Sequence, residues 1–142
     1  AAICQYLAYE LMSEGMSVPD RKPISSIALN TDGSLLTISS DDNGSNSIFS
    51  RQIQGLGDKN DVLVGLSDTG NSKNIISAFK QAKFKGLKTI ALTGDYDNQL
   101  DQIGDVSIRI PSTNPQRIQL GYLNIGQVIC NQVEYKFLLL HE

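Results

Sequence analysis

Apolar residues along this chain follow two patterns, helical spacing and short continuous runs. The first pattern opens the chain, where Cys4, Leu7 and Leu11 recur at intervals of three or four positions. Such spacing places side chains on one face of a helix. It predicts a helix over residues 1–13 that ends near Ser13.

A strand and two more helices are predicted before the middle of the chain. The apolar segment 25–30 (SSIALN) predicts a short strand. Asp32 is a favourable N-cap for the helix that follows it. Ser45 or Asn46 can cap another helix, which ends at Gly57.

The second half of the chain alternates strands and helices. Residues 61–66 (DVLVGL) are apolar on both faces, as expected of a central strand in a parallel sheet. Residues 71–86 have the spacing of an amphipathic helix, and segments 88–94 and 105–111 predict two further strands. Pro115 then stands in the first turn of a long helix, where it costs no hydrogen bond.

This order of elements predicts the fold class. Strands that alternate with helices indicate an α/β fold with a parallel sheet and right-handed crossovers. The length of 142 residues fits a single domain. Because ligands of such folds bind beyond the carboxyl ends of the strands, the segments that follow the predicted strands are where a site is expected.

Charge and composition exclude two classes of partner. The formal net charge is −3 and the pI is about 5.1. Nucleic-acid and anionic membrane surfaces require a basic excess, so we expect neither direct nucleic-acid binding nor membrane binding. Cys4 and Cys130 lie among apolar residues and are expected to be buried free thiols in a reducing compartment.

Residues 67–72 (SDTGNS) combine small and hydroxyl-bearing side chains directly after a buried strand. They precede a helix, whose unpaired N–H groups attract anions. Ser67, Thr69 and Ser72 can each donate a hydroxyl hydrogen bond, so the segment predicts a loop that holds a phosphate group without Lys or Arg. A plain helix cap is the alternative, because Ser and Asn are good N-caps. The segment has neither the lysine of a Walker loop nor the glycine spacing of a dinucleotide site.

Several motifs occur in the order typical of one known family. They are AYEL, SDDNGSNSIFSRQ, DVLVGLS, SDTGNS, IALTG and IRIPSTNPQRIQ. In these motifs the chain resembles the sugar-isomerase (SIS) domain family, in its phosphoheptose isomerase branch. The resemblance implies a flavodoxin-like three-layer sandwich with a central parallel sheet, assembled as a homotetramer. It also implies that residues 1–142 form a single SIS domain that lacks the family's N-terminal helix, first strand and GNGGS-type loop.

The resemblance assigns roles to individual residues. Ser67, Thr69 and Ser72 would hold the phosphate, Asp42 and Gln119 would contact the sugar, and Glu10 would be the catalytic acid–base group. The implied reaction converts sedoheptulose 7-phosphate to D-glycero-D-manno-heptose 7-phosphate through an enediol, in heptose synthesis for lipopolysaccharide. From the residues alone, Glu10 could equally lie on a solvated helix face, Asp42 in an ordinary turn and Gln119 on the surface.

Two positions depart from the family pattern. Gln127 stands where the isomerases have the histidine partner of the catalytic glutamate, and Tyr6 replaces a second histidine. An amide does not titrate near neutral pH, so Gln127 predicts an impaired isomerase. Some family members bind zinc through these histidines. With only Glu10 and Gln119 left as ligands, neither zinc nor another cofactor is expected here.

A second function is compatible with the same residues. A chain that keeps the phosphate loop but lacks the acid–base pair resembles the DnaA initiator-associating protein. That protein shares the fold and works by binding, without isomerising sugars. IALNTD at residues 27–32 resembles that branch. The alternative is therefore a non-catalytic regulator with a replication-initiator protein as its partner. In both cases we expect a cytoplasmic protein that binds a phosphorylated sugar.

Overall fold

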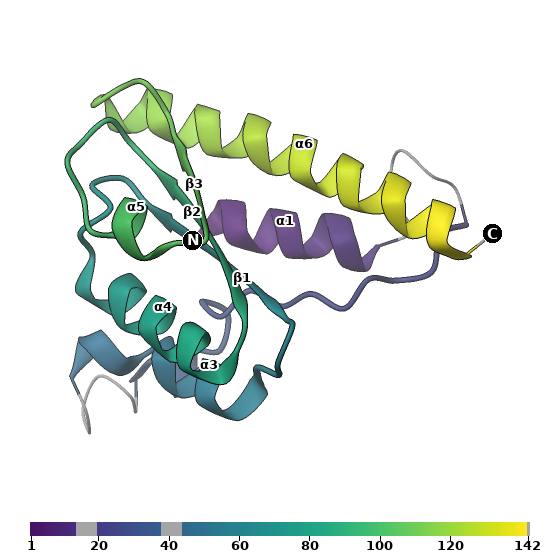
Figure 1. Ribbon diagram of the computed structural model, residues 1–142, viewed down its shortest axis with the longest axis horizontal. Coiled ribbons are helices and arrows are strands. Elements are labelled where there is room, and N and C mark those ends of the chain that lie inside the picture. Colours follow the sequence, from purple (N-terminus) through teal and green to yellow (C-terminus); the bar gives the residue numbers. More distant parts are fainter. Residues whose placement is uncertain (14–19, 38–43, 142) are drawn as a thin grey trace. The chain divides into compact units, whose positions relative to one another are not determined.

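The computed structural model describes residues 1–13, 20–37 and 44–141, and Figure 1 shows its elements. The chain divides into two compact units. The smaller unit comprises residues 1–31 and 121–142, and the larger unit comprises residues 32–120. Helix α6 (Pro115–His141) belongs to both, because the boundary falls within it.

The larger unit contains a three-stranded parallel sheet in the order β1-β2-β3. The strands are β1 (Val62–Ser67), β2 (Lys88–Thr93) and β3 (Val106–Arg109). They confirm the three strands predicted in this half of the chain and their parallel direction. Ser67 pairs with Thr93, and Thr93 with Arg109, so these three residues lie side by side at the carboxyl edge of the sheet.

Strand β1 is an edge strand of the described sheet, not the central strand that its composition predicted. Val62 is 56% exposed and Val64 is 36% exposed, whereas Ala91 and Leu92 of the central strand β2 are fully buried. An apolar run predicts a strand, but the place of that strand in the sheet depends on which segments pair with it. The prediction of a central position was therefore wrong.

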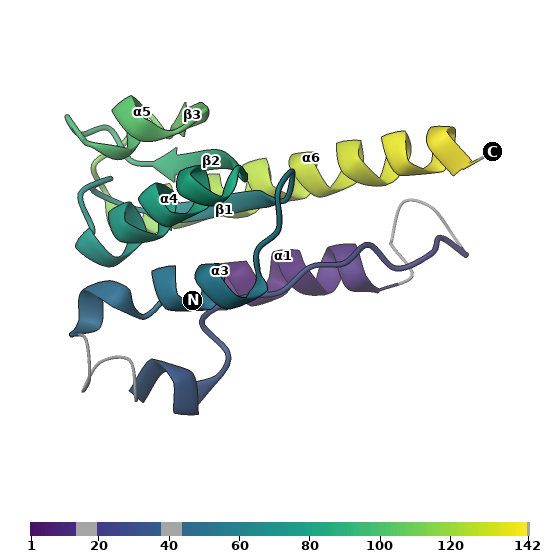
Figure 2. The ribbon, with the colours of Figure 1, turned by 60° about the horizontal axis from the view of Figure 1, so that its bottom comes forward.

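Helix α4 (Lys73–Lys85) packs against β1 and β2, and α3 (Ser50–Leu56) packs against α4 (Figures 1 and 2). The core of the larger unit consists of Ile76, Phe79, Ala91 and Leu100. Gly65 of β1 lies directly against this core, since a Cβ atom at that position would come within 2.3 Å of the Phe79 ring. Side-chain volume at one strand position therefore determines how closely α4 can approach the sheet.

Two of the predicted helix starts are confirmed by side-chain caps. The N–H of Leu35 donates to Asp32 Oδ1 at 3.0 Å, and residues 33–37 are helical. The N–H of Gln116 donates to Asn114 Oδ1 at 3.0 Å at the start of α6, where Pro115 is the first helical residue. Helix α5 (Leu100–Ile103) lies in a segment for which the sequence predicted no element.

The helix predicted after Gly44 is split in two. A 3-10 turn, η1 (Ser45–Ser47), precedes α3, and its N-cap is Gly44, so neither predicted cap is used. Serine hydroxyls account for the break. Ser47 Oγ donates to the Gly44 carbonyl at 3.1 Å, and Ser50 Oγ donates to the Ser47 carbonyl at 3.2 Å. Such side-chain bonds to the backbone compete with a continuous helix.

The smaller unit is built on α1 (Ala2–Met12) and the C-terminal part of α6. Helix α1 has its C-cap at Ser13, as predicted. The two helices approach closely at Gly126, where a Cβ atom would lie 2.5 Å from Leu7 Cδ2. The absence of a side chain at Gly126 therefore permits the contact between α1 and α6.

Residues 25–30 do not form the predicted strand. All three described strands belong to the larger unit, and the described rest of the smaller unit is helical or irregular. A strand requires a neighbour that takes up its N–H and C=O groups. The segment therefore lies outside any described ladder, although Ala28 within it is buried.

Both cysteines are free, as predicted; Cys130 is buried and Cys4 is half-buried. Burial raises the pKa of the Cys130 thiol to about 11, and the charges of Glu10 and Glu134 act in the same direction. Burial also raises the pKa of Cys4. Among the helices in the described part of the chain, none is both long enough and apolar enough to cross a membrane.

Candidate functional site

The first and last residues of segment 67–72 meet through their side chains. Ser67 is the last residue of β1 and is buried, and Ser72 is the N-cap residue of α4. Their Oγ atoms lie 2.8 Å apart in a hydrogen bond. Ser72 makes no side-chain capping bond to α4, so its hydroxyl faces Ser67 and not the helix. This arrangement differs from a plain helix cap and favours a loop that presents two adjacent hydroxyls.

The third predicted hydroxyl has a different partner. Thr69 is exposed, and its Oγ1 accepts a hydrogen bond from the N–H of Asn71 at 3.3 Å. Between them, Gly70 has a φ of +65°, which glycine adopts without steric cost. A Cβ atom at Gly70 would also lie 2.3 Å from Cγ of Asn98. Glycine at this position thus permits both the turn and the close approach of Asn98.

Asn71 joins the loop to the segment after β2. Its Nδ2 donates to the Asp97 carbonyl at 3.1 Å, and its Oδ1 accepts from the N–H of Gln99 at 3.1 Å. Backbone bonds add to this contact, from Leu100 N to the Gly70 carbonyl at 3.2 Å and from Gly94 N to the Asp68 carbonyl at 2.8 Å. Asn71 was not among the site residues predicted from the sequence, although its place inside the hydroxyl segment was a signal for it.

Asp101 of α5 is the centre of a second polar cluster. It accepts hydrogen bonds from Asn98 Nδ2 at 2.9 Å, from Arg109 Nε at 3.1 Å and from Ser107 Oγ. Burial alone would raise the pKa of Asp101, but the bonds from Ser107, Arg109 and Asn98 together lower it below its ordinary value. Arg109 also forms an ion pair with Asp95 at 3.4 Å. Arg109, at the carboxyl end of β3, is therefore already paired with two carboxylates.

The two predicted sugar-contacting residues have different outcomes. Asp42 lies outside the described residues. Gln119 is exposed on α6. Its neighbour Ile118 is fully buried beside Gly94, where a Cβ atom would lie 2.6 Å from Ile118 Cδ1. The helix that carries Gln119 is thereby anchored at the carboxyl end of β2.

Glu10 is buried in the smaller unit, with 5% of its surface exposed. A solvated helix face, the alternative open from the sequence, is therefore wrong. Arg21 binds the end of α1 at this point, donating from Nη2 to the Glu10 carbonyl and from Nη1 to the Leu11 carbonyl, each at 2.9 Å. Arg21 in turn forms a buried ion pair with Glu134 of α6 at 3.3 Å. The backbone of Glu10 is thus fixed by a contact that the sequence did not predict.

Gln127 and Tyr6 are hydrogen-bonded to each other. Gln127 Nε2 on α6 donates to Tyr6 Oη on α1 at 3.0 Å. These are the two positions at which the sequence departs from the isomerase pattern, and the structure shows that they are neighbours. Glu10, Tyr6 and Gln127 all belong to the smaller unit, whereas the hydroxyl loop belongs to the larger one.

Comparison with known proteins gives the family. The model of the SIS domain matches residues 1–94. A phosphoheptose isomerase from Sulfurimonas denitrificans is 43% identical over 134 residues, which are 94% of this chain and 68% of that protein. This chain belongs to the SIS domain family.

Further relatives and solved structures agree with this assignment. A phosphoheptose isomerase from Helicobacter pylori is 39% identical over 96% of this chain and 70% of its own. The structure of a phosphoheptose isomerase from Francisella tularensis matches with a TM-score of 0.88 and 30% identity, over 94% of this chain and 71% of that one. The structure of a phosphoheptose isomerase from Neisseria gonorrhoeae matches with a TM-score of 0.86 and 32% identity, over 94% of this chain and 70% of that one. These matches confirm the α/β SIS fold predicted from the sequence.

Zinc, which the SIS resemblance suggested for some members, does not fit the residues present here. Gln127 and Tyr6 offer an amide and a phenol that are already bonded to each other, and zinc prefers imidazole, thiolate and carboxylate ligands. The described residues contain no group of three or more His, Cys, Asp or Glu side chains that could hold a metal ion. A zinc-dependent step is therefore not assigned to this SIS domain.

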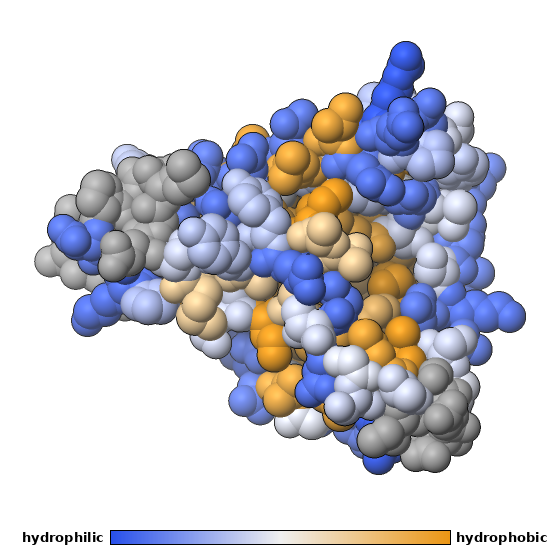
Figure 3. Space-filling model, turned by 180° about the vertical axis from the view of Figure 1, so that it is seen from behind, coloured by the Kyte–Doolittle hydropathy of each residue, from blue (hydrophilic) through white to orange (hydrophobic). Residues whose placement is uncertain are grey.

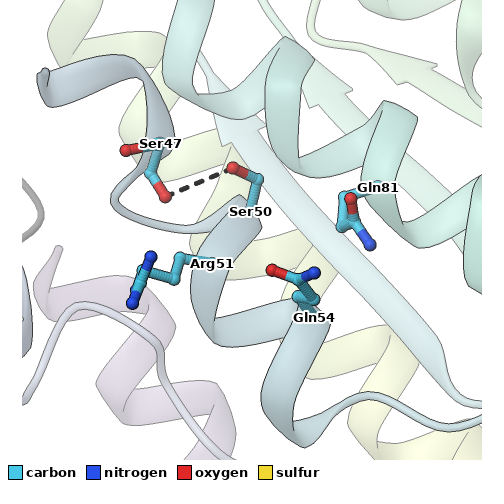
Figure 4. Close-up of a pocket in the computed structure, with 5 residues that line it drawn as sticks. All are labelled: Ser47, Ser50, Arg51, Gln54 and Gln81. Atoms are coloured by element: carbon cyan, nitrogen blue, oxygen red, sulfur yellow. Dashed lines mark hydrogen bonds between the residues drawn. The ribbon is translucent and has the colours of Figure 1, made fainter. Parts of the chain in front are cut away.

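A shallow pocket of about 190 Å³ lies elsewhere in the larger unit of this SIS domain. Figure 4 shows the polar side chains that line it, from η1, α3 and α4: Ser47, Ser50, Arg51, Gln54 and Gln81. None of the site residues predicted from the sequence lines this pocket. It therefore does not bear on the assignment of the hydroxyl loop.

Proposed function

We propose that this SIS domain is a phosphoheptose isomerase, which interconverts sedoheptulose 7-phosphate and D-glycero-D-manno-heptose 7-phosphate. The observation that carries the proposal is 43% identity to a phosphoheptose isomerase over 94% of the chain. The other relatives and the two solved structures compared above have the same name. None of these matches favours the non-catalytic regulator or a replication-initiator partner.

The phosphate of the sugar would bind at loop 67–72. Ser67 and Ser72 present hydroxyls 2.8 Å apart, close enough for both to reach oxygens of one phosphate group. Ser72 is the N-cap residue of α4, whose first N–H groups carry partial positive charge. Bracing by Asn71 would keep these donors in position before the ligand arrives. Such preorganisation lowers the entropic cost of binding.

Glu10 would move the proton between the two carbon atoms of the sugar. In the ketose-to-aldose direction its carboxylate removes a proton from C1 to give an enediol and returns it to C2. The burial of Glu10 suits this role, because a base shielded from bulk water keeps the abstracted proton for the second step. The backbone bond from Arg21 holds the helix that carries it.

The homotetramer expected from the sequence remains part of the proposal. Apolar side chains are exposed at several places in the view of Figure 3. In the smaller unit, α6 carries a groove lined by Val128, Ile129, Gln132, Val133 and Lys136, and Val128 is 56% exposed. An exposed apolar surface of this kind supports association between copies of the chain. Cytoplasmic location and a place in heptose synthesis stay predictions.

Turnover of sedoheptulose 7-phosphate by the purified protein, followed by NMR of the sugar, tests the proposal. We expect slow but measurable isomerisation that Glu10→Gln reduces by about 10²-fold or more. Asp58→Asn is the matched control, since it makes the same carboxylate-to-amide change at an exposed position. A wild-type protein that binds the sugar phosphate without converting it would contradict the isomerase and favour the regulator.

A further inference from the structure

The isomerase reaction needs a second proton-transfer group besides Glu10, and the amide of Gln127 cannot supply it. When C1 loses a proton, the oxygen on C2 must gain one, and the oxygen on C1 must later lose one. An amide side chain neither gives up nor accepts a proton near neutral pH. The candidate is a hydroxyl or other titratable side chain beside Gln127, which stands at the position of the family's histidine.

The side chain that Gln127 contacts is Tyr6. Gln127 Nε2 donates to Tyr6 Oη at 3.0 Å, so the phenol oxygen accepts in this bond and its own O–H remains available for another acceptor. A donor aimed at the phenol oxygen also stabilises the negative charge that forms there after the proton has left. Gln127 therefore both orients the hydroxyl and supports its ionised form.

Tyr6 and Glu10 stand on the same face of α1. Positions that are four apart on a helix have their Cβ atoms about 5–6 Å from each other. The contact between Gly126 and Leu7 sets the distance between α1 and α6 at this level, which keeps Gln127 within reach of Tyr6. Glu10 is buried and Tyr6 is half-buried, so these two side chains lead from the interior of the smaller unit towards its surface.

We propose that Tyr6, held by Gln127, is the catalytic partner of Glu10, an inference that rests on the proposed isomerase function. Glu10 takes the proton from C1 while the Tyr6 hydroxyl gives its proton to the oxygen on C2, which yields the enediol. The Tyr6 phenolate then takes the proton from the oxygen on C1 while Glu10 returns its proton to C2. One proton moves between the carbons and one between the oxygens, and both side chains regain their starting states.

Tyr6→Phe tests this role, because it removes only the hydroxyl. We expect kcat for sedoheptulose 7-phosphate to fall by about 10²- to 10⁴-fold, with KM and the midpoint of urea unfolding unchanged. Gln127→Leu, which leaves the hydroxyl in place without its support, should lower kcat by about tenfold. Tyr9→Phe is the matched control on the same helix, since Tyr9 is 63% exposed and should tolerate the change.

The combination with Glu10→Gln separates a catalytic from a structural role. Residues that act as a unit give non-additive losses, so Glu10→Gln with Tyr6→Phe should be no slower than Glu10→Gln alone. Turnover by Tyr6→Phe at the rate of Tyr9→Phe would overturn the inference and leave the isomerase function intact. A wild-type protein without any turnover would overturn both.

Discussion

Ser67 Oγ and Ser72 Oγ lie 2.8 Å apart, although one residue ends a strand and the other precedes a helix. They meet because the chain reverses at Gly70, whose φ is +65°. The pair brings together two hydroxyls, each an ordinary capping group, at the carboxyl edge of a parallel sheet. This is the edge at which ligands of such folds bind.

Replacing either serine should weaken phosphate binding. A hydrogen bond to a charged oxygen contributes about 1.5–3 kcal/mol, so we expect Ser67→Ala or Ser72→Ala to raise the Kd for the sugar phosphate by about tenfold or more. Calorimetry of each variant checks this, with Ser45→Ala, at an exposed serine outside the loop, as the control. Unchanged affinity in both loop variants would show that the phosphate binds elsewhere.

The buried ion pair between Arg21 and Glu134 should be costly to break on one side only. Each side chain is 1% exposed. Arg21 also donates to the Glu10 carbonyl, so it links Glu134 of α6 to the C-terminal end of α1. We expect Arg21→Met to reduce the free energy of unfolding by about 3–5 kcal/mol, because it leaves the charge of Glu134 buried and unpaired. Adding Glu134→Leu should recover much of this loss, since it removes the charge that Arg21→Met leaves unpaired.

Urea unfolding of the single and double variants measures this difference. The exposed pair between Lys83 and Asp105, at 3.9 Å, provides the control, and Lys83→Met should leave the unfolding midpoint unchanged. A double variant that is less stable than Arg21→Met would mean that the two residues stabilise the unit independently of each other.

The polar cluster around Asp101 should make stability depend on pH. Because the folded-state pKa of Asp101 is lowered, its contribution is fully present above the ordinary aspartate value of about 4 and is lost as the pH falls through the lowered pKa. Asp101→Asn should therefore destabilise the protein at pH 7 by about 1 kcal/mol, after allowance for partial exposure. The difference in free energy of unfolding between the variant and the wild type should shrink towards pH 2–3, because protonation removes the stabilisation by ionised Asp101 from the wild type. Equal differences at both pH values, measured against Asp58→Asn, would argue against an ionised Asp101 as the source.

Zinc binding should return when both departures from the family pattern are reversed together. The side chains of Tyr6 and Gln127 are in contact, with Oη and Nε2 3.0 Å apart, so two imidazoles at these positions would be close enough to share one zinc ion. We expect Tyr6→His combined with Gln127→His to bind zinc at least about tenfold more tightly than the wild type, with Glu10 as a third ligand. Competition with a chromophoric chelator measures this affinity. Stoichiometric zinc in wild-type protein purified without added metal would show that other residues are the ligands.

Local patterns in the sequence were sufficient for much of the fold. The apolar runs at 61–66 and 88–94 and the spacing of 71–86 correspond to β1, β2 and α4. Asp32 was identifiable as a cap because a cap acts on N–H groups only two or three residues away. The hydroxyl segment could be recognised for the same reason, since its chemistry and its position between a strand and a helix are both contained in a few consecutive residues.

Pairing between distant segments was decided only by the tertiary structure. Whether 25–30 becomes a strand, and whether β1 is central, depends on which neighbours supply hydrogen bonds. The residues around Glu10 left a solvated helix face open, and the packing of α1 buries Glu10 instead. The bond between Tyr6 and Gln127 joins residues that are 121 positions apart, and that between Arg21 and Glu134 spans 113. Periodicity indicates which face of a helix is apolar, but the partner of a polar side chain is determined by the packing of complete helices against each other.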